Sequence, residues 1–349
     1  MKKIIKFLTG GEEYLPGIDI GSSSIKVVSV DSQRKNFKLL SRAKIEYKEQ
    51  IISGTEIVDG YMLLNYIEEA LHSANVKEKE IAIHIPLSLC FYTVISVPEN
   101  KDAEQAVREY MQSIISPEEV SEVKIDYKIL PLSIEEGKID IAIAAVKKRF
   151  IRDRVSLLEQ AGLKVTVVDI EPAALNNQFY MNNPELTATP VCIVDIGASF
   201  TKIIISFGGY PYVTRNIETG GNYITEQIQK EFLISIEEAE ILKRGEKIKD
   251  ITYSNAYEKV ISKFVRKLIT EIMWTIENFK DRFNLEVEEI FLFGGSSKLK
   301  GIVEDIKNYT GKNVYLGEPL KFAQIPESQE FALATGLSLR YKGDENAKV

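Results

Sequence analysis

The chain contains one long-range repeat whose residue types suit phosphate binding. Residues 19–30 read D-I-G-S-S-S-I-K-V-V-S-V, and residues 195–206 read D-I-G-A-S-F-T-K-I-I-I-S. A glycine after the acid lets the backbone approach a ligand closely. Successive N–H groups in such a turn form a concavity that binds anions. The pattern therefore predicts one phosphate loop in each half of the chain.

The two aspartates of the repeat suit magnesium. Asp19 and Asp195 each end an apolar strand, and Mg2+ favours oxygen ligands while keeping much of its hydration shell. We expect both carboxylates to face Mg2+, mostly through water. Plain hairpins with polar turns are the alternative for either copy alone, but two matched copies favour phosphate loops. The candidate residues are Asp19, Gly21, Ser22, Ser23 and Lys26 in the first copy and Asp195, Gly197, Ala198, Ser199 and Thr201 in the second.

Strand-like and helix-like segments alternate along the chain, which predicts an α/β fold with sheets flanked by helices. Residues 61–74 carry apolar side chains at helical spacing, residues 218–249 read as mostly helical, and residues 256–282 read as one long amphipathic helix. Apolar runs predict strands at 18–20, 24–30, 37–45, 81–85, 163–170, 191–196, 202–207, 210–216 and 289–293. Each copy of the repeat then forms a strand, a tight turn and a second strand.

Residues 90–162 depart from this layout. A strand at 91–97, a helix at 103–115, strands at 123–130 and 138–146 and a helix at 150–161 would form one compact unit, closed by Gly162. We expect an inserted subdomain whose sheet and helices suit a protein partner.

Composition excludes several classes of protein. The net charge of −7 disfavours nucleic acid as a partner, because phosphate backbones bind to basic faces. Two cysteines, Cys90 and Cys192, make neither a disulfide framework nor a zinc site and read as small buried thiols in a reducing cytosol. The chain has no run of about 20 apolar residues that could span a membrane. Residues 1–8 are basic and apolar; we expect a first strand or a frayed end, with contact to a membrane surface as the alternative.

The repeat resembles the two phosphate loops of the actin, heat-shock chaperone and sugar-kinase superfamily. Three further segments resemble superfamily motifs in the same order. Residues 169–175, D-I-E-P-A-A-L, resemble a connecting segment; residues 290–295, I-F-L-F-G-G, the adenosine loop; and residues 331–339, F-A-L-A-T-G-L-S-L, a second connecting helix where helices cross closely. The resemblance implies ATP held with Mg2+ between two related lobes.

The same resemblance assigns roles to single residues. Glu171 would position the attacking water or act as a general base, although an acid favoured by a helix N-terminus is the alternative. Gly294, Gly295 and Ser296 would lie against the adenosine, unless Ser297 simply caps a helix that begins at Lys298. Residues 237–243, E-E-A-E-I-L-K, resemble a helix of bacterial actins, in which Glu240 and Lys243 would approach the ribose and base; a solvated helix face with an ion pair is the alternative.

Within the superfamily, the position of the inserted unit resembles that in FtsA, the cell-division actin, and in the PilM family of type IV pilus assembly. The short polar end at residues 338–349 differs from the amphipathic membrane helix of FtsA. Residues 15–28, 217–226 and 232–240 look closely like PilM proteins. Membership would imply a cytoplasmic platform that binds the N-terminal tail of a PilN-like membrane protein at the inserted subdomain and stands at the inner face of the membrane through that partner.

The expected fold is a two-lobed actin-like α/β fold with a duplicated core and an FtsA-type inserted subdomain. We expect the first lobe at 1–89, 163–186 and 332–349, the inserted subdomain at 90–162, the second lobe at 187–220 and 256–331, and its small subdomain at 221–255. A scaffold with slow or negligible ATP turnover is favoured over a sugar-type kinase, because no sugar site is recognisable. An FtsA-like filament former, a type II secretion component, self-association and contacts with pilus motor or platform proteins remain open.

Overall fold

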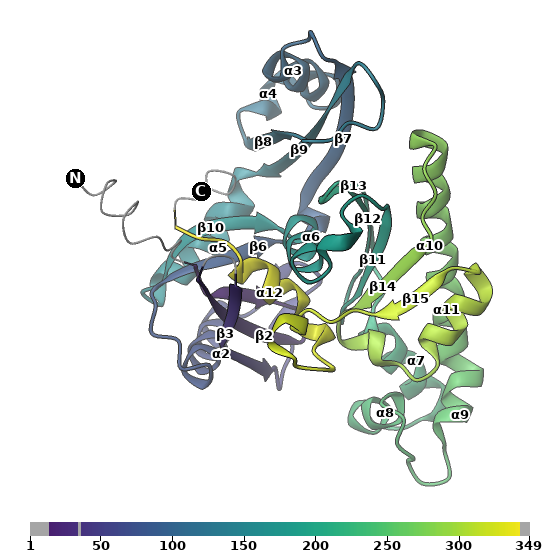
Figure 1. Ribbon diagram of the computed structural model, residues 1–349. Coiled ribbons are helices and arrows are strands. Elements are labelled where there is room, and N and C mark those ends of the chain that lie inside the picture. Colours follow the sequence, from purple (N-terminus) through teal and green to yellow (C-terminus); the bar gives the residue numbers. More distant parts are fainter. Residues whose placement is uncertain (1–13, 34–35, 343–349) are drawn as a thin grey trace. The chain divides into compact units, whose positions relative to one another are not determined.

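The computed structural model describes residues 14–33 and 36–342. The chain divides into two compact units, Met1–Asn182 with Pro319–Val349, and Asn183–Glu318 (Figure 1). The strand or frayed end expected at residues 1–8 and the last residues of the polar C-terminal segment lie outside the described residues. Within the described ranges, no helix is both long and apolar enough to cross a membrane.

The first unit is built on a five-stranded sheet in the order β10-β6-β1-β2-β3. β1 pairs antiparallel with β2 and parallel with β6, β2 pairs antiparallel with β3, and β6 pairs parallel with β10. The bounds are β1 Gly17–Ile20, β2 Ser24–Gln33, β3 Asn36–Glu46, β6 Glu80–Ile85 and β10 Lys164–Ile170. A separate short hairpin joins β4 Ile52–Ser53 to β5 Glu56–Ile57.

The second unit contains a matching five-stranded sheet. Read from the strand that corresponds to β10, its order is β15-β14-β11-β12-β13. β11 pairs antiparallel with β12 and parallel with β14, β12 pairs antiparallel with β13, and β14 pairs parallel with β15. The bounds are β11 Val191–Ile196, β12 Thr201–Phe207, β13 Tyr210–Ile217, β14 Glu289–Phe293 and β15 Asn313–Leu316. Because order and directions agree strand by strand, the predicted duplication of the core is confirmed.

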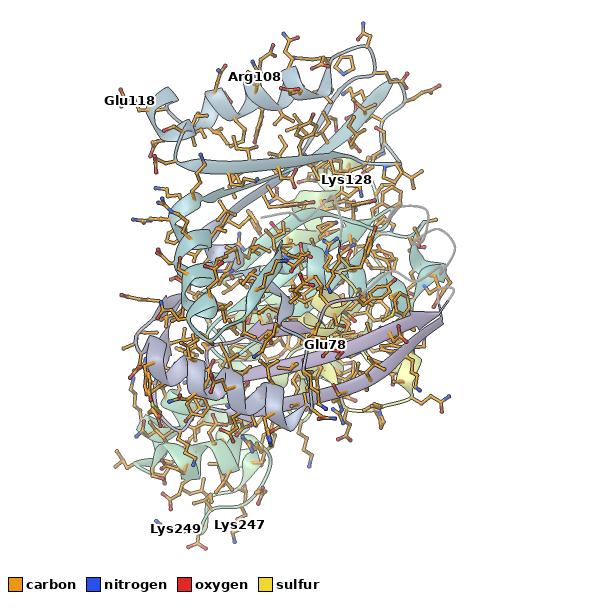
Figure 2. The ribbon with its side chains drawn as sticks, turned by 90° about the vertical axis from the view of Figure 1, so that its left-hand side faces the viewer. Glu78, Arg108, Glu118, Lys128, Lys247 and Lys249 are labelled. Carbon is orange, nitrogen blue, oxygen red and sulfur yellow. The ribbon has the colours of Figure 1, made fainter. Side chains whose placement is uncertain are left out.

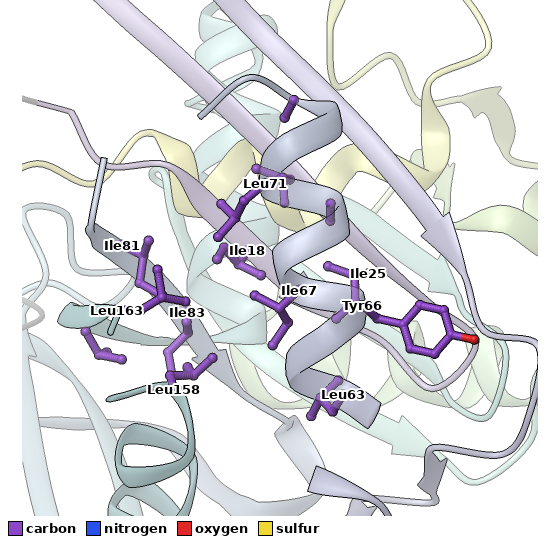
Figure 3. Packing of buried hydrophobic residues seen from close by; sticks show 14 of the residues in the cluster. Ile18, Ile25, Leu63, Tyr66, Ile67, Leu71, Ile81, Ile83, Leu158 and Leu163 are labelled. Atoms are coloured by element: carbon purple, nitrogen blue, oxygen red, sulfur yellow. The ribbon is translucent and has the colours of Figure 1, made fainter. Parts of the chain in front are cut away.

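One face of the first sheet is covered by α2 (Gly60–Ser73), which begins where the Asp59 side chain accepts a hydrogen bond from the Met62 N–H. Helical spacing turns Leu63, Ile67 and other apolar side chains of α2 towards the sheet (Figure 3). They pack against Ile18, Ile81 and Ile83, which are fully buried. Successive side chains of a strand point to opposite faces, so the neighbours of these isoleucines, including Asp19 and His84, point to the other face.

That other face meets α6 (Glu171–Asn182) and α12 (Ala332–Ser338). A Cβ on Gly17 of β1 would overlap the α12 backbone, and one on Gly336 of α12 would overlap the Ala174 carbonyl of α6. The close helix crossing expected from the small residues at 332–336 is therefore present. The segment before α12 also packs in the first unit, where Leu320 and Phe331 contact the β2 valines. The chain thus returns to the first unit at Pro319, whereas the sequence analysis placed that return at residue 332.

The inserted subdomain is a three-stranded antiparallel sheet, β7-β9-β8, covered by helices. Its core joins Met111 and its neighbours on the helix to Ile141 and Ile143 on the central strand. Exposed charged residues such as Arg108, Glu118 and Lys128 mark its outer surface (Figure 2). The bounds are β7 Cys90–Pro98, α3 Ala103–Ile114, α4 Pro117–Val120, β8 Val123–Ile129 and β9 Lys138–Lys147. The next helix, α5 (Lys148–Gln160), was assigned to this subdomain, but its Leu158 packs into the core beneath α2.

Helices complete the second unit. The segment expected to be one long helix contains a π-helical turn at Tyr257–Ile261 before α10 (Ser262–Phe283). The other helices are α7 Gly221–Phe232, α8 Ile236–Lys243, α9 Tyr253–Ala256 and α11 Ile302–Thr310. Short 3-10 helices lie at Leu87–Leu89, Pro184–Leu186, Gly295–Lys298, Lys321–Ala323 and Gln329–Phe331.

Candidate functional site

The first copy of the repeat forms a tight turn between β1 and β2. The register pairs Asp19 with Lys26, and the lysine Nζ lies 3.0 Å from Asp19 Oδ2. The Gly21 N–H donates to the Ser24 carbonyl at 3.1 Å and closes the turn. Ser22 in the turn is half-buried and Ser23 is exposed. Lys26, expected to stand near phosphates, is thus held by the aspartate of its own loop.

Tyr47 holds the same turn from behind. Its backbone N–H donates to the Ser23 carbonyl at 3.0 Å, and its hydroxyl donates to the Gly21 carbonyl at 3.1 Å. Burial, and next the charge of Asp19, raise the pKa of Tyr47, so the phenol keeps its proton and remains a donor. The sequence analysis did not identify Tyr47, because this residue follows β3 and lies outside the repeat.

The second copy repeats the geometry. Asp195 pairs with Lys202 in the register, and the Lys202 Nζ lies 3.0 Å from Asp195 Oδ2. The Gly197 N–H donates to the Phe200 carbonyl at 2.9 Å, the counterpart of the bond from Gly21. Thr201 is buried, and its hydroxyl donates to the Thr219 carbonyl at 2.7 Å. The two loops are therefore alike in contacts as well as in sequence.

The second loop is surrounded by residues from two other segments. The Gly221 N–H donates to the Gly197 carbonyl at 2.9 Å, and the Asn222 N–H donates to the Ala198 carbonyl at 2.8 Å. Ser296 Oγ lies 3.5 Å from the same Gly197 carbonyl. Ser199 in the loop is half-buried. The start of α7, where helix N–H groups favour anions, is thus brought to the loop.

Glu240 and Lys243 of α8 join this group. Lys243 Nζ donates to Glu240 Oε1 at 2.5 Å, to Thr225 Oγ1 at 2.8 Å and to the Gly221 carbonyl at 3.2 Å. Burial lowers the pKa of Lys243, and the charge of Glu240 opposes that shift. The Lys243 side chain is only 12% exposed, so this pair does not form a solvated helix face.

The double glycine after β14 stands beside Asp195. Gly294 has φ +83°, and a Cβ there would overlap the Ile196 carbonyl and lie 2.8 Å from Asp195 Oδ1. The Ser297 hydroxyl donates to the Gly294 carbonyl at 2.7 Å, and α11 begins only at Ile302. The alternative in which Ser297 caps a helix from Lys298 is therefore wrong. Gly295 is exposed and opens the short 3-10 helix that carries Ser296.

Glu171 lies in the first unit at the start of α6, directly after β10, and is 4% exposed. Its Oε2 accepts a hydrogen bond from the Leu87 N–H at 2.7 Å. Its Oε1 lies 3.7 Å from His84 Nδ1, and His84 Nε2 lies 3.4 Å from Asp19 Oδ1. Because β1, β6 and β10 run parallel, their carboxyl ends bring these side chains to one edge, where open α/β sheets bind ligands.

The site residues fall into two groups. In the first unit, Asp19, Gly21, Lys26 and Glu171 lie around His84 and Tyr47; in the second, Asp195, Gly197, Glu240, Lys243 and Ser296 lie around Gly221 and Thr225. The sequence analysis assigned no role to His84, Tyr47, Thr219, Gly221 or Thr225. Thr219, Gly221 and Thr225 fall within residues 217–226, and the resemblance of that segment to PilM proteins could have pointed to them.

Several known proteins are similar to this chain. The family model described as type IV pilus assembly protein PilM matches residues 17–342. A cell division protein FtsA from Neisseria meningitidis serogroup B is 26% identical over 310 residues, covering 81% of this chain and 67% of the relative. A solved PilM-PilN type IV pilus biogenesis complex aligns with a TM-score of 0.79 at 25% identity, covering 94% of this chain and 98% of that one.

The fold itself has wider relatives. An archaeal actin homologue aligns with a TM-score of 0.50 at 13% identity over 93% of this chain and 98% of its own, which shows a shared fold alone. The duplicated five-stranded sheets agree with that likeness, and the expected actin-like fold with an inserted subdomain is confirmed. Because the family match spans nearly the whole described chain, the protein belongs to the type IV pilus assembly protein PilM family.

Proposed function

We propose that this chain is an ATP-binding platform protein of type IV pilus assembly, which binds the cytoplasmic N-terminal tail of a PilN-like inner-membrane protein. The observation that carries the proposal is the pair of matched loops, each closed by the same glycine hydrogen bond and carrying an aspartate at its strand end. The family match and the likeness to a PilM-PilN complex support the pilus role.

Each unit carries residues that suit part of a nucleotide. The turn amides of residues 22–23 and 198–199 suit phosphates, whereas the Gly21 and Gly197 N–H groups close the two turns. Glu240 and Lys243 would contact the ribose and base, and Gly294, Gly295 and Ser296 the adenosine. A glycine is needed at 294 because a Cβ would overlap the Ile196 carbonyl, and this close packing holds the strand end beside Asp195.

The donor set fits magnesium bound mainly through water. In the described residues, no three histidine, cysteine or acidic side chains gather as a metal cluster. Each loop offers one carboxylate, Asp19 or Asp195. This suits Mg2+, which keeps several water ligands and takes further oxygen ligands from phosphates. Bound Mg2+ would neutralise phosphate charge.

Turnover is expected to be slow or negligible. Glu171 is the candidate to position water, but one of its carboxylate oxygens already accepts the Leu87 N–H. A general base must reach the proton that it takes. We therefore favour a structural or regulatory role for ATP.

The nucleotide proposal is tested by calorimetric titration with ATP and Mg2+. We expect Asp19→Asn to weaken binding at least 100-fold, and removal of Mg2+ with EDTA to weaken it in the unaltered protein. Asp19→Asn leaves Lys26 mostly buried without its carboxylate, so thermal unfolding of the variant is measured to distinguish lost folding from lost binding. Asp31→Asn on the exposed part of β2 is the matched control. Unchanged affinity in a folded Asp19 variant contradicts the phosphate-loop assignment.

The inserted subdomain is the proposed partner site. Its described surface carries several large apolar side chains at 39–49% exposure, namely Phe91, Ile114, Tyr127, Ile129 and Leu132. Its outer strands, β7 and β8, could each pair with an extended peptide. The occupant that we propose is the PilN-like tail, since the similar PilM structure was solved as a complex with PilN.

A synthetic peptide of a PilN-type N-terminal tail tests this site by calorimetry. We expect Ile129→Asp on β8 to weaken peptide binding at least tenfold. Leu233→Asp in the second unit is the control, because Leu233 is 92% exposed and lies on another subdomain. Loss of binding in the Leu233 variant alone would move the partner site away from the inserted subdomain.

The relation to FtsA favours one alternative, a filament-forming cell-division actin. Sedimentation with ATP and Mg2+ distinguishes it, since a pellet at low micromolar protein would indicate polymerisation. A type II secretion role and contacts with pilus motor or platform proteins remain compatible with the platform proposal, as does a cytoplasmic location at the membrane through the partner.

A further inference from the structure

His84 is a buried histidine whose ring faces two carboxylates. The residue is 5% exposed, and its Nε2 and Nδ1 lie 3.4 Å from Asp19 Oδ1 and 3.7 Å from Glu171 Oε1. Neither ring nitrogen makes a hydrogen bond within the described part of the chain. Buried polar atoms without a hydrogen bond weaken a fold, so such a group calls for an explanation.

The duplicated sheet supplies an internal comparison. β14 is the counterpart of β6, and its residue beside Asp195 is Phe293, which is 1% exposed. In the first sheet, Gly17 pairs with Ala82, so Asp19 lies beside His84 in the same way. An apolar side chain is therefore compatible with this position in the fold, and packing alone does not call for a histidine at 84.

The contacts of His84 continue towards the inserted subdomain. Glu171, on one side of the ring, accepts the Leu87 N–H at 2.7 Å. Leu87–Leu89 forms a short 3-10 helix, and Cys90 then begins β7 of the inserted subdomain. On the other side of the ring, Asp19 belongs to the first phosphate loop. His84 thus stands between the loop and the root of the inserted subdomain.

The His84 ring lies between the two carboxylates and makes a hydrogen bond to neither of them. A movement of the ring towards Asp19 would take it away from Glu171, and the reverse. A ligand that changes the position of the Asp19 carboxylate would therefore change the contact between His84 and Glu171. This is a local element with two arrangements, which coupling between two sites requires.

We propose that His84 is a positioning residue that couples nucleotide binding at the first phosphate loop to peptide binding at the inserted subdomain. The inference rests on the proposed function, because it needs both ligands to bind. It adds the residue through which one site would influence the other, and the coupling must act equally in both directions.

The test measures coupling in the full chain. The affinity for ATP with Mg2+ is titrated with and without a saturating PilN-type peptide, and the peptide is titrated with and without ATP. We expect the unaltered protein to show a factor of at least about fivefold. His84→Leu should bring that factor to about one while both ligands still bind, and His84→Gln, which keeps a donor and an acceptor, should retain part of it. His72→Leu on the exposed face of α2 is the control.

The possible results distinguish a failure of the coupling inference from a failure of the proposed function. A coupling factor that is unchanged in His84→Leu overturns the inference, as does an unaltered protein that binds both ligands without coupling, although the proposed function then stands. Failure of the unaltered protein to bind ATP or the peptide contradicts the proposed function and the inference together. Thermal unfolding of both His84 variants distinguishes lost folding from lost coupling, and a folded His84→Leu that keeps the coupling shows a structural role only.

Discussion

At the scale of single residues, Gly294 combines a positive φ with a crowded Cβ position. Its φ of +83° disfavours any side chain, and a Cβ would overlap the Ile196 carbonyl beside Asp195. We expect Gly294→Ala to lower the free energy of unfolding by about 2 kcal/mol or more and to abolish ATP binding. Chemical denaturation and calorimetry measure the two effects. Gly311→Ala is the control: its φ is +70°, but nothing lies within 4 Å of its Cβ position, so only the cost of about 1–2 kcal/mol for the left-handed backbone remains. Equal losses in both variants would contradict the role of the close approach.

The thiol at the root of the inserted subdomain gives a prediction about pH. Of the two expected buried thiols, Cys192 is fully buried but Cys90 is half-buried. Burial still raises the pKa of Cys90 to about 12, assisted by the charges of Glu171 and Asp169 and opposed by a backbone hydrogen bond at Ala145. Alkylation needs the thiolate. At pH 8.5, iodoacetamide should therefore modify Cys90 at least 100-fold more slowly than a free cysteine, and denaturant should remove the difference. Mass spectrometry after timed quenching measures the rate; modification at the free-cysteine rate would show that the thiol is not protected by burial.

At the scale of elements, the crossing of α6 and α12 leaves no space for a side chain at Gly336. A Cβ there would overlap the Ala174 carbonyl, so the helices must separate to admit it. We expect Gly336→Ala to cost about 1–3 kcal/mol of stability, although alanine is the better helix former. Gly60→Ala at the start of α2 is the matched control, since its Cβ would meet only the mobile end of Leu157 at 3.1 Å. Denaturant midpoints compare the two, and a stabilised Gly336→Ala would contradict the packing argument.

Some helices and strands could be predicted from the sequence, and others could not. The repeat and the apolar runs predicted all five strands of the first sheet and four of the five in the second, because strand periodicity and tight turns are local properties. The edge strand β15 was not predicted. The π-helical turn before α10 and the packing of α5 on the core depend on distant contacts and were missed. At the site, the aspartates and glycines were predicted from spacing, whereas the lysine partner of each aspartate was not. His84 meets Asp19 only through the pairing of parallel strands, which a single sequence does not specify.

At the scale of the whole molecule, the division into two compact units, each with one of the matched loops, gives a prediction about unfolding. Units of this kind need not unfold together, so the calorimetric enthalpy of the free protein should exceed the van 't Hoff enthalpy. ATP with Mg2+ at 100 times Kd should stabilise what it binds by about 2.7 kcal/mol. If both loops hold the nucleotide, both transitions should rise and converge, and either Asp19→Asn or Asp195→Asn should abolish the shift. Scanning calorimetry of the full chain measures both transitions with ATP and with AMP as the control nucleotide. A rise confined to one transition would mean that only one unit holds the nucleotide, and the proposal that both loops bind it would be wrong.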